Sequence, residues 1–229
     1  MRNYHQDYFY LHATGRNTPR LSFDKNQVRD THLLFQECPI TEDHVITMKF
    51  GSPIPPKPEL GDVLKKLQHS VVSDRLKALL KEMKLKGVQY LPSEIRNPNT
   101  DDVYTDYWVL HIHNLIYCLN REESKFDMSN GSVASIEKLV FDHEVLDKVP
   151  LEERLVFALG EQSLYTFFHR SVAEKIASLQ PQNVQFTSLG FEDEATDPLP
   201  ELLLPYVYYP VRKVYEEEDE DLEDRKSVV

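Results

Sequence analysis

Two segments of the chain, residues 72–90 and 168–186, repeat one pattern at a separation of 96 residues. In both segments the apolar residues recur at the spacing of a helix that has one buried face. The apolar positions that align without a gap are Val72, Leu76, Leu80 and Met83 with Phe168, Val172, Ile176 and Leu179. Each run ends at a residue that tolerates a left-handed backbone, Gly87 or Asn183, and then enters a short Val-Gln-aromatic strand. Any two amphipathic helices share such spacing, but the matching turn and strand favour a repeat of two similar helix–turn–strand units.

The composition is that of a globular protein with one large domain or two small ones. The chain has 229 residues, of which 41% are hydrophobic, so it can bury a core. No run approaches the roughly 18 apolar residues of a membrane span, and the N-terminal residues lack the apolar region of a signal peptide. We therefore expect a cytoplasmic protein without membrane contact. The two cysteines, Cys38 and Cys118, form no CxxC pair, which predicts two free thiols.

The negative charge is concentrated near the C-terminus. The net charge is −12, and eight negative charges fall within residues 216–224, so the rest of the chain carries only −4. Such a run is usually a solvated tail, but it can also act as an anionic arm that competes for a cationic surface on a partner. The residues that we assign to partner binding on this basis are Glu216, Glu217, Glu218, Asp219, Glu220 and Asp221. Nucleic acid is disfavoured as a partner because the field has the wrong sign for phosphate.

Proline content divides the chain. Four of the six residues from 53 to 58 are prolines, which excludes a helix and indicates an extended connector. We predict an N-terminal strand-rich piece with this connector (1–58), a body that contains the repeat (59–195), an extended arm (196–215) and the acidic tail (216–229). Within the body and the N-terminal piece we predict an α+β fold, in which helices pack on a mixed sheet.

The expected elements outside the two repeat helices come from β-branched content and apolar runs. The expected strands are 4–13, 43–50, 88–91 (ending at Pro92), 107–119, 136–141 and 184–187. The expected further helices are a short one near 62–68 and one over 152–159. On the long strand, Trp108, Leu110 and Ile112 share one face, while Val109, His111 and His113 share the other.

His111 and His113 are candidate metal ligands, because residues two apart on a strand face the same side. A third ligand would have to come from elsewhere, for example from Asp106 or His143, and no spacing motif indicates one. A structural role is the more common reading of such a pair, and we predict no metal and no cofactor.

Asp142 and Glu144 follow a predicted strand, where catalytic carboxylates can lie. The chain has no G-x-S-x-G, P-loop, GxGxxG or HExxH motif to accompany them. We therefore predict that the protein is not an enzyme and has no catalytic residues.

The run from about residue 70 to residue 192 resembles the immunity proteins of bacterial polymorphic toxin systems. The residues that carry the resemblance are Val72 to Lys77, Gly87 to Pro92, Tyr107 to Leu110, Asn114, Cys118 to Glu122, Ser124, Phe126 and Lys138 to Asp142. The second unit departs from the pattern at Phe168 to Ser171 and at the turn Gln180-Pro181-Gln182, and the chain adds a proline-rich connector and an acidic tail. These departures leave the type of toxin open.

The resemblance implies a cytoplasmic bacterial protein that binds the secreted toxin encoded beside it and blocks that toxin by occlusion, without catalysis. The acidic charge would favour a basic toxin domain, such as a nuclease. The alternatives are a small-ligand-binding protein or an enzyme that uses a cleft near His111 and His113, and a scaffold or adaptor. A toxin gene directly upstream would support the first function, and a metabolic operon the second. Oligomeric state and toxin-contacting residues do not follow from the sequence.

Overall fold

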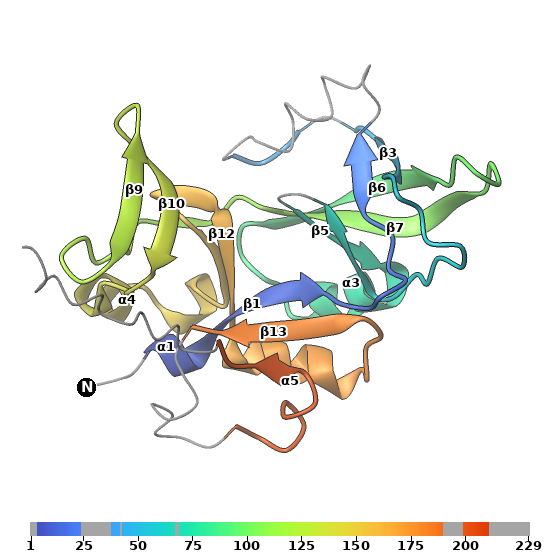
Figure 1. Cartoon of the computed structure of the whole chain (residues 1–229). Coiled ribbons are helices and arrows are strands. Elements are labelled where there is room, and N and C mark those ends of the chain that lie inside the picture. The colour runs from blue at the N-terminus through green and yellow to red at the C-terminus, as the bar shows by residue number, and fades with distance from the viewer. Residues whose placement is uncertain (1–3, 24–37, 42, 67–68, 190–198, 211–229) are drawn as a thin grey trace, which may run out of the picture.

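Two six-stranded sheets and the helices between them make up most of the chain in the computed structural model, which describes residues 4–23, 38–41, 43–66, 69–189 and 199–210 (Figure 1). The helices are α1 (Tyr4–Asp7), α3 (Asp74–Glu82), α4 (His143–Lys148), α5 (Arg170–Ser178) and the 3-10 turn η1 (Leu151–Glu153). The strands are β1 (Tyr8–Ala13), β2 (Leu21–Phe23), β3 (Ile46–Phe50), β4 (Val63–Lys66), β5 (His69–Ser73), β6 (Val88–Arg96), β7 (Val103–Ile112), β8 (Leu115–Ile116), β9 (Lys125–Ser129), β10 (Ser132–Lys138), β11 (Val156–Leu159), β12 (Gln162–His169), β13 (Val184–Ser188) and β14 (Val207–Tyr208). The predicted α+β class is confirmed.

The two repeat helices form, but each begins two residues later than the sequence predicts, because Val72-Ser73 and Phe168-His169 still belong to strands β5 and β12. Both α3 and α5 span nine residues, and the side chain of the preceding residue, Ser73 or His169, accepts a hydrogen bond from a backbone N–H of the first turn. The turns also match, because Gly87 (φ 63°) and Asn183 (φ 58°) both adopt the left-handed conformation directly before their strands. At Gly87 an added Cβ would collide with Asn114, so the close approach of the neighbouring loop also requires glycine there.

The repeat extends beyond the helices to the whole sheet around each of them. The first sheet is a closed barrel in the order β2-β3-β6-β7-β5-β4, and the second is an open sheet in the order β14-β13-β1-β12-β11-β8. β6-β7-β5-β4 therefore corresponds to β13-β1-β12-β11, with one register throughout: Val72 pairs with Trp108 as Phe168 pairs with Phe9. The middle strands also share the pattern Tyr-aromatic-x-Leu-His, which is Tyr107-Trp108-Val109-Leu110-His111 in β7 and Tyr8-Phe9-Tyr10-Leu11-His12 in β1.

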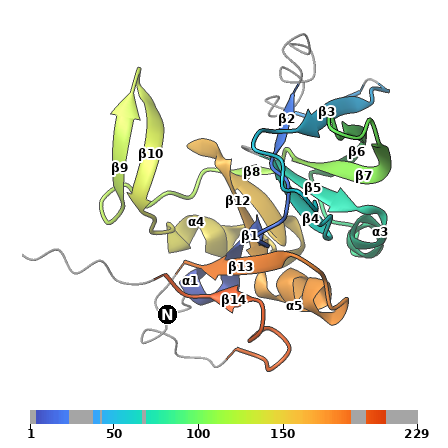
Figure 2. The same ribbon diagram turned by 45° about the vertical axis from the view of Figure 1, so that its right-hand side comes forward.

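The middle strand of each sheet comes from the other half of the chain. β1 lies at the N-terminus but pairs with β12 and β13, whereas β7 begins the second half but pairs with β5 and β6. The two halves thus exchange one strand each. Figures 1 and 2 show β1 beside β13 in the open sheet, from which the chain continues toward β2 on the barrel side. Neither sheet is complete without a strand of the other half.

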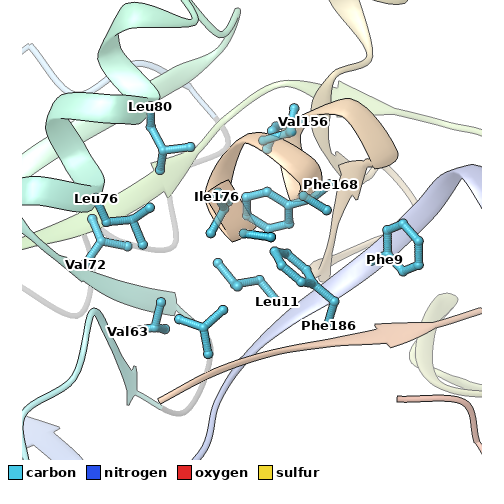
Figure 3. Close-up of a cluster of buried hydrophobic side chains, with 14 of the residues drawn as sticks. Phe9, Leu11, Val63, Val72, Leu76, Leu80, Val156, Phe168, Ile176 and Phe186 are labelled. Carbon is cyan, nitrogen blue, oxygen red and sulfur yellow. The ribbon is translucent and has the colours of Figure 1, made fainter. Parts of the chain in front are cut away.

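The core consists of one shared cluster and one cluster per sheet. α3 and α5 lie side by side on the shared cluster, and their buried residues Leu76, Leu80 and Ile176 point toward one another (Figure 3). The second cluster fills the barrel, and the third fills the space between the open sheet, α4 and β10. Along β7, Trp108, Leu110 and Ile112 pack on the shared cluster, while Val109 faces the barrel interior, as the two-residue period predicts.

Several sequence-based assignments are wrong or misplaced, beginning with the expected strand 4–13, whose first four residues are helix α1. Residues 63–66 of the expected helix 62–68 are strand β4, because they pair with the adjacent β5. Within the expected helix 152–159, only η1 is helical, and Val156 to Leu159 form β11. All four residues of β11 are buried between β12 and β8, so they show no alternation that would reveal a strand.

The remaining errors concern strand ends. β6 continues through Pro92 to Arg96, because β3 pairs with β6 only from Ser93 onward and the missing N–H of Pro92 leaves that ladder intact. The long strand is interrupted after Ile112, and the strand expected over 136–141 is β10, which starts at Ser132 and ends at Lys138. The Asn130-Gly131 turn joins β10 to β9 in a hairpin that projects from the body in both views (Figures 1 and 2).

Candidate functional site

A groove of about 600 Å³ lies on the barrel side of the molecule, where α3 passes over β6 and β7. We call it the α3 groove and define it by Lys77 and Lys81 of α3, Tyr90 of β6, Trp108 of β7, and Ile40 and Val45 of the segment before β3. Its lining combines two lysines, two aromatic rings and aliphatic surface, and on the side before β3 it also includes Asp43 and His44. Such a mixture is typical of a surface that binds an amphipathic partner.

Trp108, the single tryptophan of the chain, forms the aromatic wall of the α3 groove. The Lys77 ammonium lies over its ring, 2.9 Å from the centroid, and the Trp108 indole N–H donates a hydrogen bond to the Asp74 carboxylate. Asp74 also lies 3.8 Å from the Lys77 ammonium. Burial lowers the pKa of Lys77, an effect that Asp74 partly offsets. The three residues hold a cation at a fixed position on the groove wall.

Lys81 and Tyr90 add polar groups that face the groove without being used by the fold. Lys81 is exposed and has no ion-pair partner among the residues that the structure describes. Burial raises the pKa of Tyr90 to about 12, so its hydroxyl stays protonated and can donate at neutral pH. A ligand in the groove therefore meets an ammonium group and a phenol donor next to Lys77.

Gln89, the residue between Val88 and Tyr90 in the repeated strand motif, positions one side of the groove. Its amide accepts a hydrogen bond from Ile40 N (2.8 Å) and donates one to Ile40 O (3.0 Å). His111 Nε2 lies 3.1 Å from the Cys38 carbonyl, which can only accept, so this nitrogen donates. Together the two side chains fix residues 38–40 against β6 and β7.

This geometry gives His111 a structural role. Its side chain is buried, and burial lowers the pKa of both His111 and His113, whose rings are 5.7 Å apart. His143 instead packs on Tyr4, with ring centroids 5.3 Å apart. Among the described residues, no three histidine, cysteine or carboxylate side chains gather as metal ligands.

The carboxylates singled out as a possible catalytic pair belong to a helix start. Asp142 is the N-cap of α4 and accepts hydrogen bonds from Glu144 N and Val145 N. The Glu144 side chain is exposed in the first turn, where a negative charge favours the helix. The two cysteines are free, as predicted, with Cys38 exposed and Cys118 buried. Burial raises the pKa of the Cys118 thiol.

The six acidic residues predicted to bind a partner, Glu216 to Asp221, lie outside the residues that the structure describes. None of the described helices is long and apolar enough to cross a membrane. The α3 groove was not predicted. A signal for it exists in the aligned repeat, because Lys77 and Lys81 fall on Ala173 and Ala177, so the two helices differ in polarity on one face.

Comparison with known proteins gives one family. Residues 17–190 match the Immunity protein family (Imm11). No match was found among curated proteins. The matched range contains both repeat units and every residue that defines the α3 groove.

Proposed function

Because this chain belongs to the Immunity protein family (Imm11), we propose that it binds a cognate bacterial toxin and neutralises it by occlusion, without catalysis. The observation that carries the proposal is the extent of the family match, which spans residues 17–190. The protein would act in the cytoplasm, as part of a polymorphic toxin system used in competition between bacteria.

Occlusion requires a stable complementary surface and no reacting group. A specific complex of this kind buries about 1,200–2,000 Å² in total, which a surface patch of ordinary size supplies. The shared core and the exchanged strands support the proposal, because a scaffold that does not rearrange loses little entropy on binding. A catalytic or ligand-binding cleft at His111 and His113 has no such support, since the buried His111 is bonded to the Cys38 carbonyl and neither residue lines the α3 groove.

The acidic tail is our candidate for steering the toxin. Eight carboxylates in residues 216–224 create a negative field that accelerates association with a basic toxin domain, and Glu216 to Asp221 would face that domain. Deleting residues 216–229 should slow association at low salt and change it little at about 0.5 M salt, where charges are screened within a few ångströms. Stopped-flow association rates measure this, and an unchanged rate at low salt would leave the tail no role in steering.

Co-expression with the toxin encoded by the neighbouring gene tests the proposed function. The chain should restore growth and co-elute with the toxin domain in gel filtration. The variants His113→Ala and Glu144→Ala should protect cells from the toxin as well as the unmodified chain does, because neither side chain takes part in a reaction during neutralisation. If either variant stays folded and bound to the toxin but no longer protects, neutralisation involves catalysis.

A further inference from the structure

The internal repeat allows the α3 groove to be compared with the equivalent place in the open sheet. Lys77, Lys81, Tyr90 and Trp108 correspond to Ala173, Ala177, Phe186 and Phe9. These four equivalents, two on α5 and two in the open sheet, are at most 1% exposed and belong to the shared core. The same structural position is therefore covered in one unit and hollow in the other.

The cover in the open-sheet unit is the chain segment from residue 199 to residue 208. Leu203 in this segment is fully buried in the same cluster as Ala173, Ala177 and Phe186, and Tyr206 and Val207 pack against that cluster. Tyr206 O accepts a hydrogen bond from Phe186 N (2.7 Å), and β14 continues the sheet beside β13 (Figure 2). Residues 201–206 form hydrogen-bonded turns that place Leu203 in the core, and β14 follows them. A compact turn with a leucine anchor thus fills this site.

The barrel unit carries a different cover. Residues 40, 41 and 43–45 precede β3, which lies along the edge that β14 occupies in the other sheet, because β3 pairs in parallel with β6 as β14 pairs with β13. They leave the groove of about 600 Å³ between themselves and α3. Its walls carry lysines where the filled site has alanines, and a tyrosine where the filled site has phenylalanine.

We propose that a segment of the toxin domain occupies the α3 groove, as residues 199–208 occupy the equivalent position in the open-sheet unit. This inference rests on the proposed function. The segment carries an apolar side chain for the surface of Ile40, Val45 and Trp108, and a carboxylate for Lys77 and Lys81. Asp43 also lines the groove, but among the described residues it forms no ion pair with either lysine, and Asp74 lies beside Lys77 alone. The two lysines therefore favour a carboxylate on the bound segment.

The first measurement is affinity for the toxin domain. Lys77→Glu with Lys81→Glu should raise the Kd at least tenfold, because two attractive pairs become repulsive. Tyr90→Phe, which removes only a hydroxyl, should raise it a few fold. The matched control is Lys148→Glu on α4, an exposed lysine remote from the groove, which should change the Kd by less than about threefold. Thermal unfolding of each variant verifies that the fold is retained.

The second measurement uses Trp108 as a reporter. Because the chain has one tryptophan, incorporation of 5-fluorotryptophan gives a single ¹⁹F resonance from the groove wall, and the unlabelled toxin domain stays invisible. Addition of the toxin domain should shift this resonance and protect it from a soluble paramagnetic quencher. A resonance that shifts with the concentration of the chain alone would mean that a second copy fills the groove. A resonance already protected in the free chain would mean that its own residues fill it. Either result overturns the inference.

The outcomes separate the two proposals. If the unmodified chain binds the toxin domain but the charge-reversed variant binds equally well and the resonance does not move, toxin binding stands and the groove assignment is wrong. If the unmodified chain does not bind the toxin domain at all, the proposed function itself fails.

Discussion

At the scale of single residues, Asp62 joins the two halves of the chain. The Asp62 carboxylate accepts hydrogen bonds from Ser73 Oγ (2.7 Å), Gln182 N (2.8 Å) and the Arg75 guanidinium, and Asp62 N donates to Gln182 O (2.9 Å). The residue is 5% exposed. It therefore links the start of α3 to the turn after α5, which comes 120 residues later in the chain.

Replacing Asp62 should destabilise the protein. Asp62→Ala leaves Gln182 N and Ser73 Oγ without their acceptor, and we expect the free energy of unfolding to fall by about 2–3 kcal/mol. Chemical denaturation measures this change. Glu94→Gln, which alters an exposed carboxylate on β6, serves as the control and should stay within about 0.5 kcal/mol. Equal effects of the two substitutions would contradict this role.

The same carboxylate should make stability depend on pH. Burial alone would raise the pKa of Asp62, but the hydrogen bonds from Arg75, Gln182 and Ser73 outweigh it and hold the pKa below its usual value. Because the pKa of Asp62 is lower in the folded state than in the unfolded state, its carboxylate stabilises the fold fully above the unfolded pKa of about 4. This stabilisation disappears as the pH falls through the folded-state pKa. The stability advantage of the unmodified chain over Asp62→Asn should therefore be constant from pH 5 to 7 and shrink below about pH 4. Denaturation midpoints across that range measure it, and an advantage that grows toward acid pH would refute the linkage.

At the scale of elements, helix starts are fixed by local capping, and α4 gives a clear test. Asp142→Ala removes the acceptor of two N–H groups and should cost about 1 kcal/mol of stability. Toxin neutralisation should be unaffected. Glu144→Ala is the matched change, because its side chain accepts no cap bond, and it should cost only a few tenths of a kcal/mol through the helix dipole. Thermal unfolding and a growth assay together distinguish the capping role from a catalytic one.

The packing of α3 against α5 is a tertiary contact between elements, which depends on buried side chains and not on helix capping. Leu80 and Ile176 are equivalent residues of the two repeat units, both fully buried in the shared cluster (Figure 3). Leu80→Ala and Ile176→Ala should each cost about 2–4 kcal/mol. The double variant should lose less than the sum, since neighbouring cavities couple. Leu164→Ala, at a 40% exposed leucine of β12, is the control. Additive losses would show that the two helices pack independently.

At the scale of the whole molecule, strand exchange makes the two halves interdependent. Residues 1–99 contain β1 to β6 but lack β7, and residues 100–229 contain β7 to β14 but lack β1. Each fragment alone should fail to fold, because its sheet lacks the middle strand. The two fragments expressed together should co-purify and unfold as one unit, since the cut falls in the exposed turn near Asn99. Circular dichroism and a pull-down test this. Cooperative unfolding of either fragment alone would exclude the interdependence.

The sequence alone determined the local part of this structure. The two helices, their caps and their left-handed turns at Gly87 and Asn183 follow from interactions between residues a few positions apart, which the spacing of apolar residues records. The alternation along β7 follows for the same reason. The family resemblance of residues 70–192 was likewise readable without a structure, and the match over 17–190 confirms it.

Only the tertiary structure decided which strands pair and which surfaces remain open. Residues 63–66 and 156–159 are strands because of their partners β5, β12 and β8, and segments of four residues do not specify those partners. The shared Tyr-aromatic-x-Leu-His sequence of β1 and β7 marks them as related. It does not specify their partners, because Phe9 pairs with Phe168 far along the chain, whereas Trp108 pairs with the much nearer Val72. The α3 groove exists for the same reason: the segment that covers its equivalent in the other sheet lies at the far end of the chain.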